Sequence, residues 1–294
     1  MSIVEQTIAR LRKQQVAAMP QSQTGSVPPV AAARNPSPGP ASPLPSPTTS
    51  IVIDPAALRA AGYQPEPDRA RQFADQFRHI KRPLIDKATS GNTAVGEPRV
   101  VLVTSAFQGD GKTFTSVNLA LSMALERDLS VLLVDVDAAK RRVSEIFGLQ
   151  NQPGLMDLLE NETLDPERVV VGTSMAGLSI LPAGRQTAGA VELLSSNRMR
   201  KIISALCARN ARRILLLDAP PLLVTTEGRT LARLAGQVVL VVRAGTTPRH
   251  AVEAALKLFD AQQAGGVILN HLDAGPSESY YYTYAPYGTA GDGP

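Results

Sequence analysis

The most specific chemical signal in this 294-residue chain is a glycine-rich stretch, Ala106-Phe107-Gln108-Gly109-Asp110-Gly111-Lys112-Thr113. It fits the phosphate-binding pattern G-x-x-x-x-G-K-[ST], with Ala106 in place of the first glycine. Gly109 and Gly111 let the backbone curl so that successive N–H groups point at phosphate oxygens, and the following helix adds its dipole. We expect Lys112 to reach the β- and γ-phosphates and the Thr113 hydroxyl to ligate Mg²⁺. The predicted nucleotide-binding residues are Gln108, Gly109, Asp110, Gly111, Lys112, Thr113 and Phe114.

Three carboxylates follow apolar runs elsewhere in the chain. Asp135 and Asp137 follow the run that begins at Val131, and Asp218 ends the run that begins at Ile214. Ligands of open parallel sheets bind at the carboxyl ends of the strands, so we expect all three side chains at that edge. Because strand residues alternate between faces, Asp135 and Asp137 have different roles unless the strand has already ended. Asp218 is typical of a carboxylate that holds the water of a magnesium ion.

The elements that must position these residues are six continuous apolar runs, as expected for strands buried on both faces. Helical stretches at 113–126, 198–208 and 248–262 separate most of them. This alternation predicts an α/β fold with a mainly parallel sheet and helices on both faces. The six runs are 100–104, 131–135, 178–181, 214–218, 238–242 and 267–270.

The N-terminal third of the chain has a different composition. Nine of the 23 prolines lie between Met19 and Ser50, so residues 19–50 are expected to form a disordered linker. Residues 1–18 carry apolar side chains at helical spacing, which fits either a frayed helical tail or a helix that docks on another protein. Residues 68–88 are expected to form a helix that breaks at Pro83.

Composition excludes several classes of protein. The single cysteine, Cys207, excludes a disulfide scaffold, and three scattered histidines argue against a histidine-rich metal site. There is no run of about 18 apolar residues, and the first residues lack the pattern of a signal peptide, so we expect a cytoplasmic protein. The net charge of +4 comes from dispersed residues and gives no argument for nucleic-acid binding.

Taken together, the motifs resemble those of the bacterial tyrosine kinases over about residues 99–270. The first matching motif is T-x-x-x-x-N-L-A at Thr113 to Ala120. The second is the D-x-D at Asp135, followed by Lys140, Arg141, Arg142 and Phe147-Gly148. The third is the D-x-P-P at Asp218 to Pro221. Upstream, Gln76-Phe77-Arg78-His79-Ile80-Lys81 resembles the assembly helix E-[FY]-R-x-[IL]-[RK], with Gln76 in place of glutamate. Ala139-Lys140, residues 78–84 and residues 220–227 are most similar to the tyrosine autokinases of exopolysaccharide loci associated with exosortase systems.

The resemblance implies a P-loop NTPase fold similar to that of the partition ATPases, and a tyrosine autokinase that uses ATP and Mg²⁺. It implies catalytic roles for Lys112, Asp135 and Asp137, metal ligands at Thr113, Asp137 and Asp218, and an adenine contact at Asn270. A phenol of pKa about 10 is a poor nucleophile at neutral pH, so Asp135 is our candidate to accept or orient its proton. Five of the six tyrosines lie near the C-terminus and match the family's autophosphorylated cluster: Tyr280, Tyr281, Tyr282, Tyr284 and Tyr287.

The family's assembly and partners are implied in the same way. Arg78 and Lys81 would contribute to contacts in a ring-shaped homo-oligomer. The activator would be a separate membrane-spanning chain-length co-polymerase, and a cognate tyrosine phosphatase would reverse the modification. The chain would then be cytoplasmic and peripheral at the inner membrane through its partner.

Two alternative functions differ from this interpretation in identifiable residues. Partition and septum-placement ATPases carry an extra lysine in K-G-G-x-G-K-T, where this chain has Phe107, and they lack a terminal tyrosine cluster. A nucleotide-binding adaptor of polysaccharide export without kinase activity would not need Lys112, Asp135 and Asp218 intact. The sequence therefore favours a kinase, divided into an N-terminal helix (1–18), a Pro-rich linker (19–50), a helical extension with the assembly motif (51–98), a kinase domain (99–272) and a Tyr-rich tail (273–294).

Overall fold

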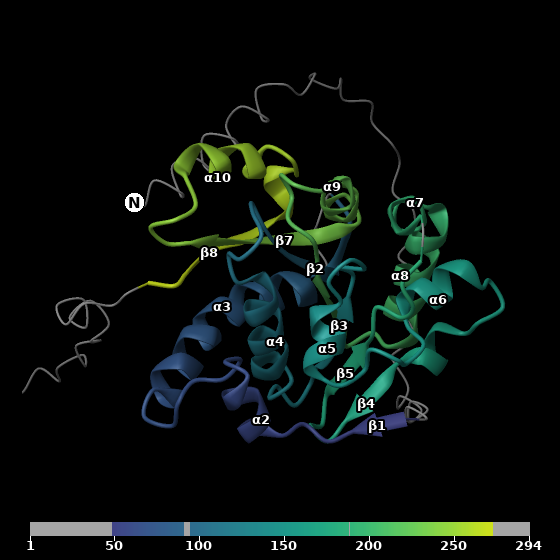
Figure 1. The fold of residues 1–294 in the computed structure, drawn as a ribbon, viewed down its shortest axis with the longest axis horizontal. Helices are drawn as coiled ribbons and strands as arrows, with labels where there is room; N and C mark the ends of the chain where they lie inside the picture. Colours follow the sequence, from purple (N-terminus) through teal and green to yellow (C-terminus); the bar gives the residue numbers. More distant parts are fainter. Residues whose placement is uncertain (1–48, 91–94, 188, 273–294) are drawn as a thin grey trace, which may run out of the picture.

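The structure is a computed structural model of the chain and describes residues 49–90, 95–187 and 189–272. An eight-stranded sheet runs through it in the order β1-β4-β5-β3-β6-β2-β7-β8 (Figure 1). The strands are β1 (Thr49–Ile51), β2 (Glu97–Ser105), β3 (Ser130–Asp135), β4 (Val171–Thr173), β5 (Leu178–Leu181), β6 (Arg213–Asp218), β7 (Ala235–Arg243) and β8 (Ala264–Asn270). The predicted α/β fold of the P-loop NTPase type is confirmed.

Neighbouring strands are parallel except for β4 and β5. Only a short turn joins these two strands, whereas a parallel crossover needs a dozen or more residues, so they pair as an antiparallel hairpin. The central strands β3, β6 and β2 are adjacent and end at the same edge of the sheet. Their register places Asp135 opposite Asp218, and Asp218 opposite Val103. The sheet therefore brings the ends of three distant segments together.

Helices cover both faces of the sheet (Figure 1). On one face α3, α4 and α5 pack around the buried side chains Leu84, Val117 and Val143, and on the other α6 to α10 pack around Leu158, Met199 and Ala251. The helices are α2 (Pro55–Ala60), α3 (Ala70–Ser90), α4 (Lys112–Met123), α5 (Arg142–Ile146), α6 (Leu155–Glu160), α7 (Ala190–Leu194), α8 (Asn197–Arg209), α9 (Thr226–Ala232) and α10 (Arg249–Leu256).

The predicted break at Pro83 is wrong, because α3 continues through this residue to Ser90. The Pro83 ring is exposed, so the carbonyl that loses its N–H partner lies on the solvent side of the helix. The expected helix at 248–262 is shorter, since α10 ends at Leu256 and a separate 3₁₀ turn forms at Ala261–Gln263.

The segment expected to be a helical extension also supplies a strand. β1 begins at Thr49, inside the predicted linker, and pairs in parallel with β4 at the edge of the sheet. The helix of this extension, α3, packs on α4, β2 and β8. The predicted helix at 1–18, nearly all of the linker and the Tyr-rich tail lie outside the described residues. In the described ranges, no helix combines the length and apolar character that a membrane span requires.

Candidate functional site

The phosphate-binding loop joins β2 to α4 and has the backbone that its glycines predict. Gly109 and Gly111 have φ values of 89° and 98°, in the left-handed region that favours glycine. Gly111 precedes the first residue of α4 and provides no side-chain cap, so the first N–H groups of the helix remain available to a phosphate. Ala106 is fully buried in the apolar core and has no positive φ, which explains why alanine replaces the first glycine.

Asp110 stabilises this loop with its side chain. Its Oδ2 accepts a hydrogen bond from the Phe107 N–H at 3.1 Å, and its Oδ1 accepts one from Thr247 Oγ1 at 2.8 Å. From the end of β8, Asn270 Nδ2 donates to the Asp110 carbonyl at 3.1 Å. A Cβ at position 111 would lie 1.9 Å from that same nitrogen, so Asn270 also requires glycine there. Asn270 thus touches the loop, and the proposed adenine contact stays a prediction.

Lys112 and Asp137 form a buried ion pair in which Nζ lies 2.8 Å from Oδ2. Burial disfavours the charge of Lys112, but Asp218 and Asp137 outweigh it and raise the pKa of the ammonium. Asp137 Oδ1 accepts a hydrogen bond from the Lys140 backbone N–H at 3.2 Å. Lys112, the residue predicted to bind phosphate, is therefore charged, and the Asp137 carboxylate holds it in place.

Asp218 lies at the end of β6 and contacts two hydroxyl groups of α4. Its Oδ2 accepts from Thr113 Oγ1 at 2.8 Å and its Oδ1 from Ser116 Oγ at 2.9 Å. The carboxylate is fully buried, and this burial raises its pKa although Lys112 and the two hydroxyls oppose the shift. The structure thus places Thr113 and Asp218, two of the three predicted metal ligands, in direct contact.

Asp135, the last residue of β3, has a different environment from Asp137. Its Oδ2 accepts hydrogen bonds from the Ser144 backbone N–H at 2.8 Å and from Ser144 Oγ at 2.7 Å. Its Oδ1 is buried and has no hydrogen-bond partner among the described residues. Burial, reinforced by the negative charge of Asp218, raises the pKa of Asp135 to about 7. The β3 strand ends at Asp135, so strand alternation does not separate the two carboxylates of the D-x-D; their contacts do, with Ser144 for Asp135 and Lys112 for Asp137.

The donor set fits a magnesium ion bound together with a nucleotide. Mg²⁺ prefers oxygen ligands and is usually held by one or two protein groups plus substrate phosphates and water. Thr113 and Asp218 offer such oxygens and lie in direct contact with each other. Within the described ranges, no cluster of three or more His, Cys, Asp or Glu side chains could hold a metal ion by itself. The site therefore suits an ion that arrives with phosphates.

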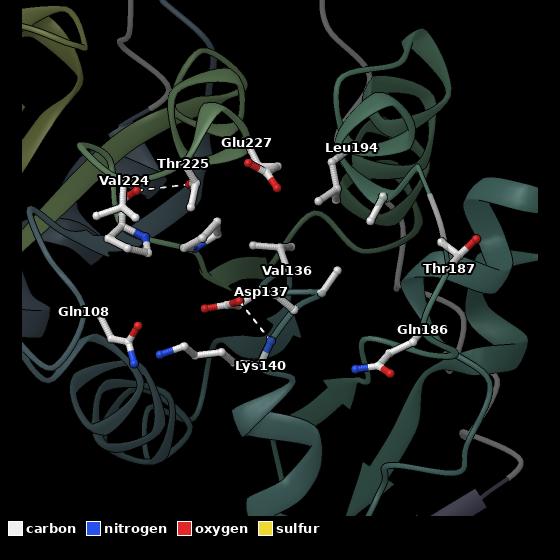
Figure 2. Close-up of a pocket in the computed structure, with 15 residues that line it drawn as sticks. Gln108, Val136, Asp137, Lys140, Gln186, Thr187, Leu194, Val224, Thr225 and Glu227 are labelled. Atoms are coloured by element: carbon white, nitrogen blue, oxygen red, sulfur yellow. Dashed lines mark hydrogen bonds between the residues drawn. The ribbon is translucent and has the colours of Figure 1, made fainter.

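A cavity of about 470 Å³ opens beside the phosphate loop (Figure 2). Val136, Asp137 and Lys140 line it from the end of β3, and Pro220 and Val224 line it from the segment after β6. In Figure 2 the side chain of Lys140 extends toward Gln108 of the loop. The walls combine apolar side chains with a few polar groups, as in pockets that bind small molecules.

Other predicted site residues lie away from this cluster. Phe114 packs edge-on against Phe73 of α3, with the ring centroids 5.8 Å apart. Arg78 is exposed and pairs with Asp75 on its own helix. Lys81 is buried, donates to the Ser122 carbonyl at 2.7 Å, and lies 2.8 Å from Glu126. The Lys81 ammonium is therefore paired within the chain, and its part in an oligomer contact stays a prediction. The five tail tyrosines lie outside the described residues.

Sequence reasoning missed three polar side chains that complete the site. Ser116 lies one helical turn after Thr113, so the helical period could have identified it as a second partner of Asp218. Ser144 and Thr247 contact Asp135 and Asp110 from segments that no local pattern connects with them.

Comparison with known proteins places this geometry in a family. Residues 99–264 match the family described as "AAA domain". The tyrosine-protein kinase YwqD of Bacillus subtilis is 31% identical over 191 residues, which cover 64% of this chain and 77% of YwqD. The crystal structure of the VpsO kinase domain superposes with a TM-score of 0.57 at 32% identity, covering 69% of this chain and 98% of that domain.

A third relative shows that length varies among these proteins. The tyrosine-protein kinase ptk of Acinetobacter johnsonii is 33% identical over 166 residues, which cover 55% of this chain but only 22% of ptk. The chain thus spans about a quarter of the length of the first curated relatives it matches. The sheet order, the phosphate loop and the relatives agree: the chain belongs to the bacterial tyrosine-protein kinases, within the AAA domain family.

Proposed function

We propose that this chain is a Mg²⁺- and ATP-dependent protein tyrosine autokinase that phosphorylates its own C-terminal tyrosines. The observation that carries the proposal is the cluster at the end of the central strands, where Lys112 pairs with Asp137 and Thr113 with Asp218 at 2.8 Å each. The family membership and the tyrosine cluster of the sequence support the same activity.

Phosphoryl transfer requires positioning and charge neutralisation more than covalent chemistry by the protein. The N–H groups of the loop and the start of α4 bind the phosphates. Lys112 leaves Asp137 and neutralises charge on the transferred group. Thr113, Asp137 and Asp218 would hold the magnesium ion, which when bound neutralises phosphate charge.

The acceptor is the phenol of a tyrosine that enters the cavity beside the loop. Its oxygen forms a bond to the γ-phosphorus while the bond from that phosphorus to the β–γ bridging oxygen breaks, which releases ADP. The phenolic proton passes to Asp135, whose Oδ1 has no hydrogen-bond partner among the described residues. A carboxylate in this position assists because a phenol is largely protonated at neutral pH.

Transfer between subunits is the arrangement we propose for Tyr280, Tyr281, Tyr282, Tyr284 and Tyr287. Ten residues of coil span about 15–20 Å, enough to reach the site of an adjacent subunit in a ring. The exposed Arg78 is the basic side chain of the assembly motif that remains available for this contact. Each phosphate adds about −1.5 to −2 charges, so we expect phosphorylation to loosen the ring.

The partners and location follow from the family resemblance. We propose a separate membrane-spanning co-polymerase as the activator, a cognate tyrosine phosphatase as its opponent, and a role in exopolysaccharide polymerisation or export. The chain would act at the cytoplasmic side of the inner membrane through that activator.

The test mixes an inactive acceptor chain, Lys112→Met, with a donor chain that keeps the kinase site but has phenylalanine in place of its five tail tyrosines, in the presence of ATP and Mg²⁺. Transfer in trans places phosphotyrosine on the Lys112→Met chain, mapped by mass spectrometry, and sedimentation shows smaller species after phosphorylation. Unlabelled Lys112→Met chain would contradict trans transfer. Nucleotide binding by the wild type without any phosphotyrosine would instead favour the adaptor function.

A further inference from the structure

Ser144 makes the closest polar contacts of any described residue with Asp135. It lies in the first turn of α5, is fully buried, and donates its backbone N–H and its hydroxyl to the same oxygen, Asp135 Oδ2, at 2.8 and 2.7 Å. Two donors on one oxygen define the rotation of a carboxylate, because any other orientation leaves both donors unpaired.

The direction of the Ser144 hydroxyl proton is set from the opposite side. Ser144 Oγ accepts a hydrogen bond from the backbone N–H of Ala183 at 2.9 Å. A hydroxyl has one proton to donate, and with Ala183 on an acceptor position that proton points at Asp135. The hydroxyl therefore links Asp135 to the segment that follows β5.

The turn that carries Ser144 is itself strained. Arg141, directly before α5, has a φ of 48°, which is uncommon for a residue with a side chain. Its guanidinium donates to the Gly184 carbonyl at 3.1 Å, next to the residue that contacts Ser144. Strained backbone persists where the surrounding contacts determine it, and here it places Ser144 against Asp135.

We infer that Ser144 is a positioning residue: by holding Asp135 Oδ2, it leaves Oδ1 free and oriented for the phenol of the acceptor tyrosine. The inference rests on the proposed function, in which Asp135 receives the phenolic proton. Oδ1 is buried and has no hydrogen-bond partner in the described part of the chain, so it is the carboxylate oxygen left to take the proton. Ser144 does not itself touch the reacting groups.

The first experiment compares Ser144→Ala, Ser144→Thr and the matched control Thr173→Val in the full chain. Thr173 Oγ1, on strand β4, lies within hydrogen-bond distance of the Met175 and Leu178 carbonyls, at 3.1 and 3.0 Å. We expect Ser144→Ala to lower kcat for autophosphorylation about 10- to 100-fold, the range for partners that orient a site residue, with the KM for ATP within about twofold. Ser144→Thr, which keeps the hydroxyl, should restore most of kcat, and Thr173→Val should leave it unchanged.

The second experiment combines Ser144→Ala with Asp135→Asn in a double-mutant cycle. If Ser144 acts through Asp135, its substitution adds less than about twofold to the loss in the Asp135→Asn background. A full additional loss there, or a kcat within twofold of wild type for Ser144→Ala alone, overturns the inference.

Two further readouts separate other causes. Ser144→Ala should lower the urea unfolding midpoint, because the Ala183 N–H loses its acceptor, and Thr173→Val, which also loses a hydroxyl that accepts a backbone N–H, controls for that loss of stability. Binding of a fluorescent ATP analogue should match between Ser144→Ala and Ser144→Thr, because a general defect of the site would weaken it. The cycle is also measured on ATP hydrolysis. If the wild type hydrolyses ATP without forming phosphotyrosine, the proposed function fails, while the hydrolysis cycle still decides the role of Ser144.

Discussion

Lys112 and Lys81 are both buried, at 7% and 6% exposure, in two regions that differ in their balance of charge. Around Lys112 lie three buried carboxylates, Asp135, Asp137 and Asp218, against one ammonium. Lys81 has one carboxylate, Glu126, and the carbonyl of Ser122. The excess negative charge at the phosphate loop lowers the stability of the free protein, and a bound cation would relieve it. The charges around Lys81 balance one another, so that region needs no further ion.

The largest expected effect is that of Lys112→Met. We expect phosphotyrosine formation to fall by at least about 10²–10³-fold, because the group that neutralises the transferred phosphate is lost. The free energy of unfolding in EDTA should fall by about 3 kcal/mol, since three buried carboxylates lose their counter-charge, and Mg²⁺ should restore part of it. The matched control is Lys201→Met, an exposed lysine of α8. Wild-type phosphotyrosine in a folded Lys112→Met protein would rule out the kinase assignment.

The pH dependence of stability gives a second test of the excess charge. Because the pKa of Asp135 is raised to about 7 in the folded chain, its ionisation opposes folding. The free energy of unfolding should therefore fall as the pH rises from about 4 to about 7, and Asp135→Asn should make that fall shallower. Urea titrations at pH 5 and pH 8 in EDTA measure the difference. Equal slopes in the two proteins would show that the Asp135 charge is compensated in the free chain.

Substitutions in the α3 region should change the free energy of unfolding and leave the phosphoryl-transfer step unchanged. Lys81→Met removes a buried donor from the C-terminal end of α4 and should cost about 1–3 kcal/mol of unfolding free energy. The exposed pair of Arg78 and Asp75 should contribute little, so Arg78→Ala should change stability by less than about 0.5 kcal/mol. Sedimentation of both variants tests assembly: a loss of large species in Arg78→Ala alone supports its proposed contact, and unchanged species contradict it.

A further test concerns Asn118, which connects the two regions. This residue of α4 donates to the Tyr63 carbonyl at 2.8 Å and accepts from Gln64 Nε2, so it ties the segment after α2 to the helix that begins at Lys112. Asn118→Ala should cost about 1–2 kcal/mol. In a chain with the five tail tyrosines changed to phenylalanine, Tyr63 is the only tyrosine and there is no tryptophan. The emission spectrum of Tyr63 should shift in Asn118→Ala. An unchanged spectrum would show that the segment after α2 keeps its position without the Asn118 contacts.

The sequence predicted the centre of the molecule better than its edges. The six apolar runs all form strands, and the central ones are buried on both faces as expected, whereas β8 at the edge of the sheet is half-buried and exposes Leu269. β1 and β4 have three residues each, too few for any pattern to show. The position of Lys81 was readable, since it shares a helical face with Phe77, Leu84 and Ala88, all buried. The helical period thus predicts the burial of Lys81, and the motif resemblance does not.

The candidate site likewise has parts that local sequence patterns predict and parts that they do not. The phosphate loop and Asp218 are predicted by local patterns, because a strand, a turn and a helix suffice to place them. The contacts of Ser144 with Asp135 and of Thr247 with Asp110 depend on how separate loops meet above the sheet. Spacing along the chain contains no information about such contacts.

The side-chain contacts that hold the phosphate loop in place have a consequence for how ATP binds. Asp110 holds the loop to Thr247, and Asn270 lies against Gly111, so the N–H groups already have one conformation before any ligand arrives. A loop that is ordered in advance loses little entropy on binding, which favours a higher affinity than a mobile loop with the same contacts would have. Its two partners come from the loop after β7 and from the end of β8, the strand that directly precedes the tyrosine tail. Asn270 therefore joins the last described strand directly to the phosphate loop, so a shift at the end of β8 would change the position of Gly111.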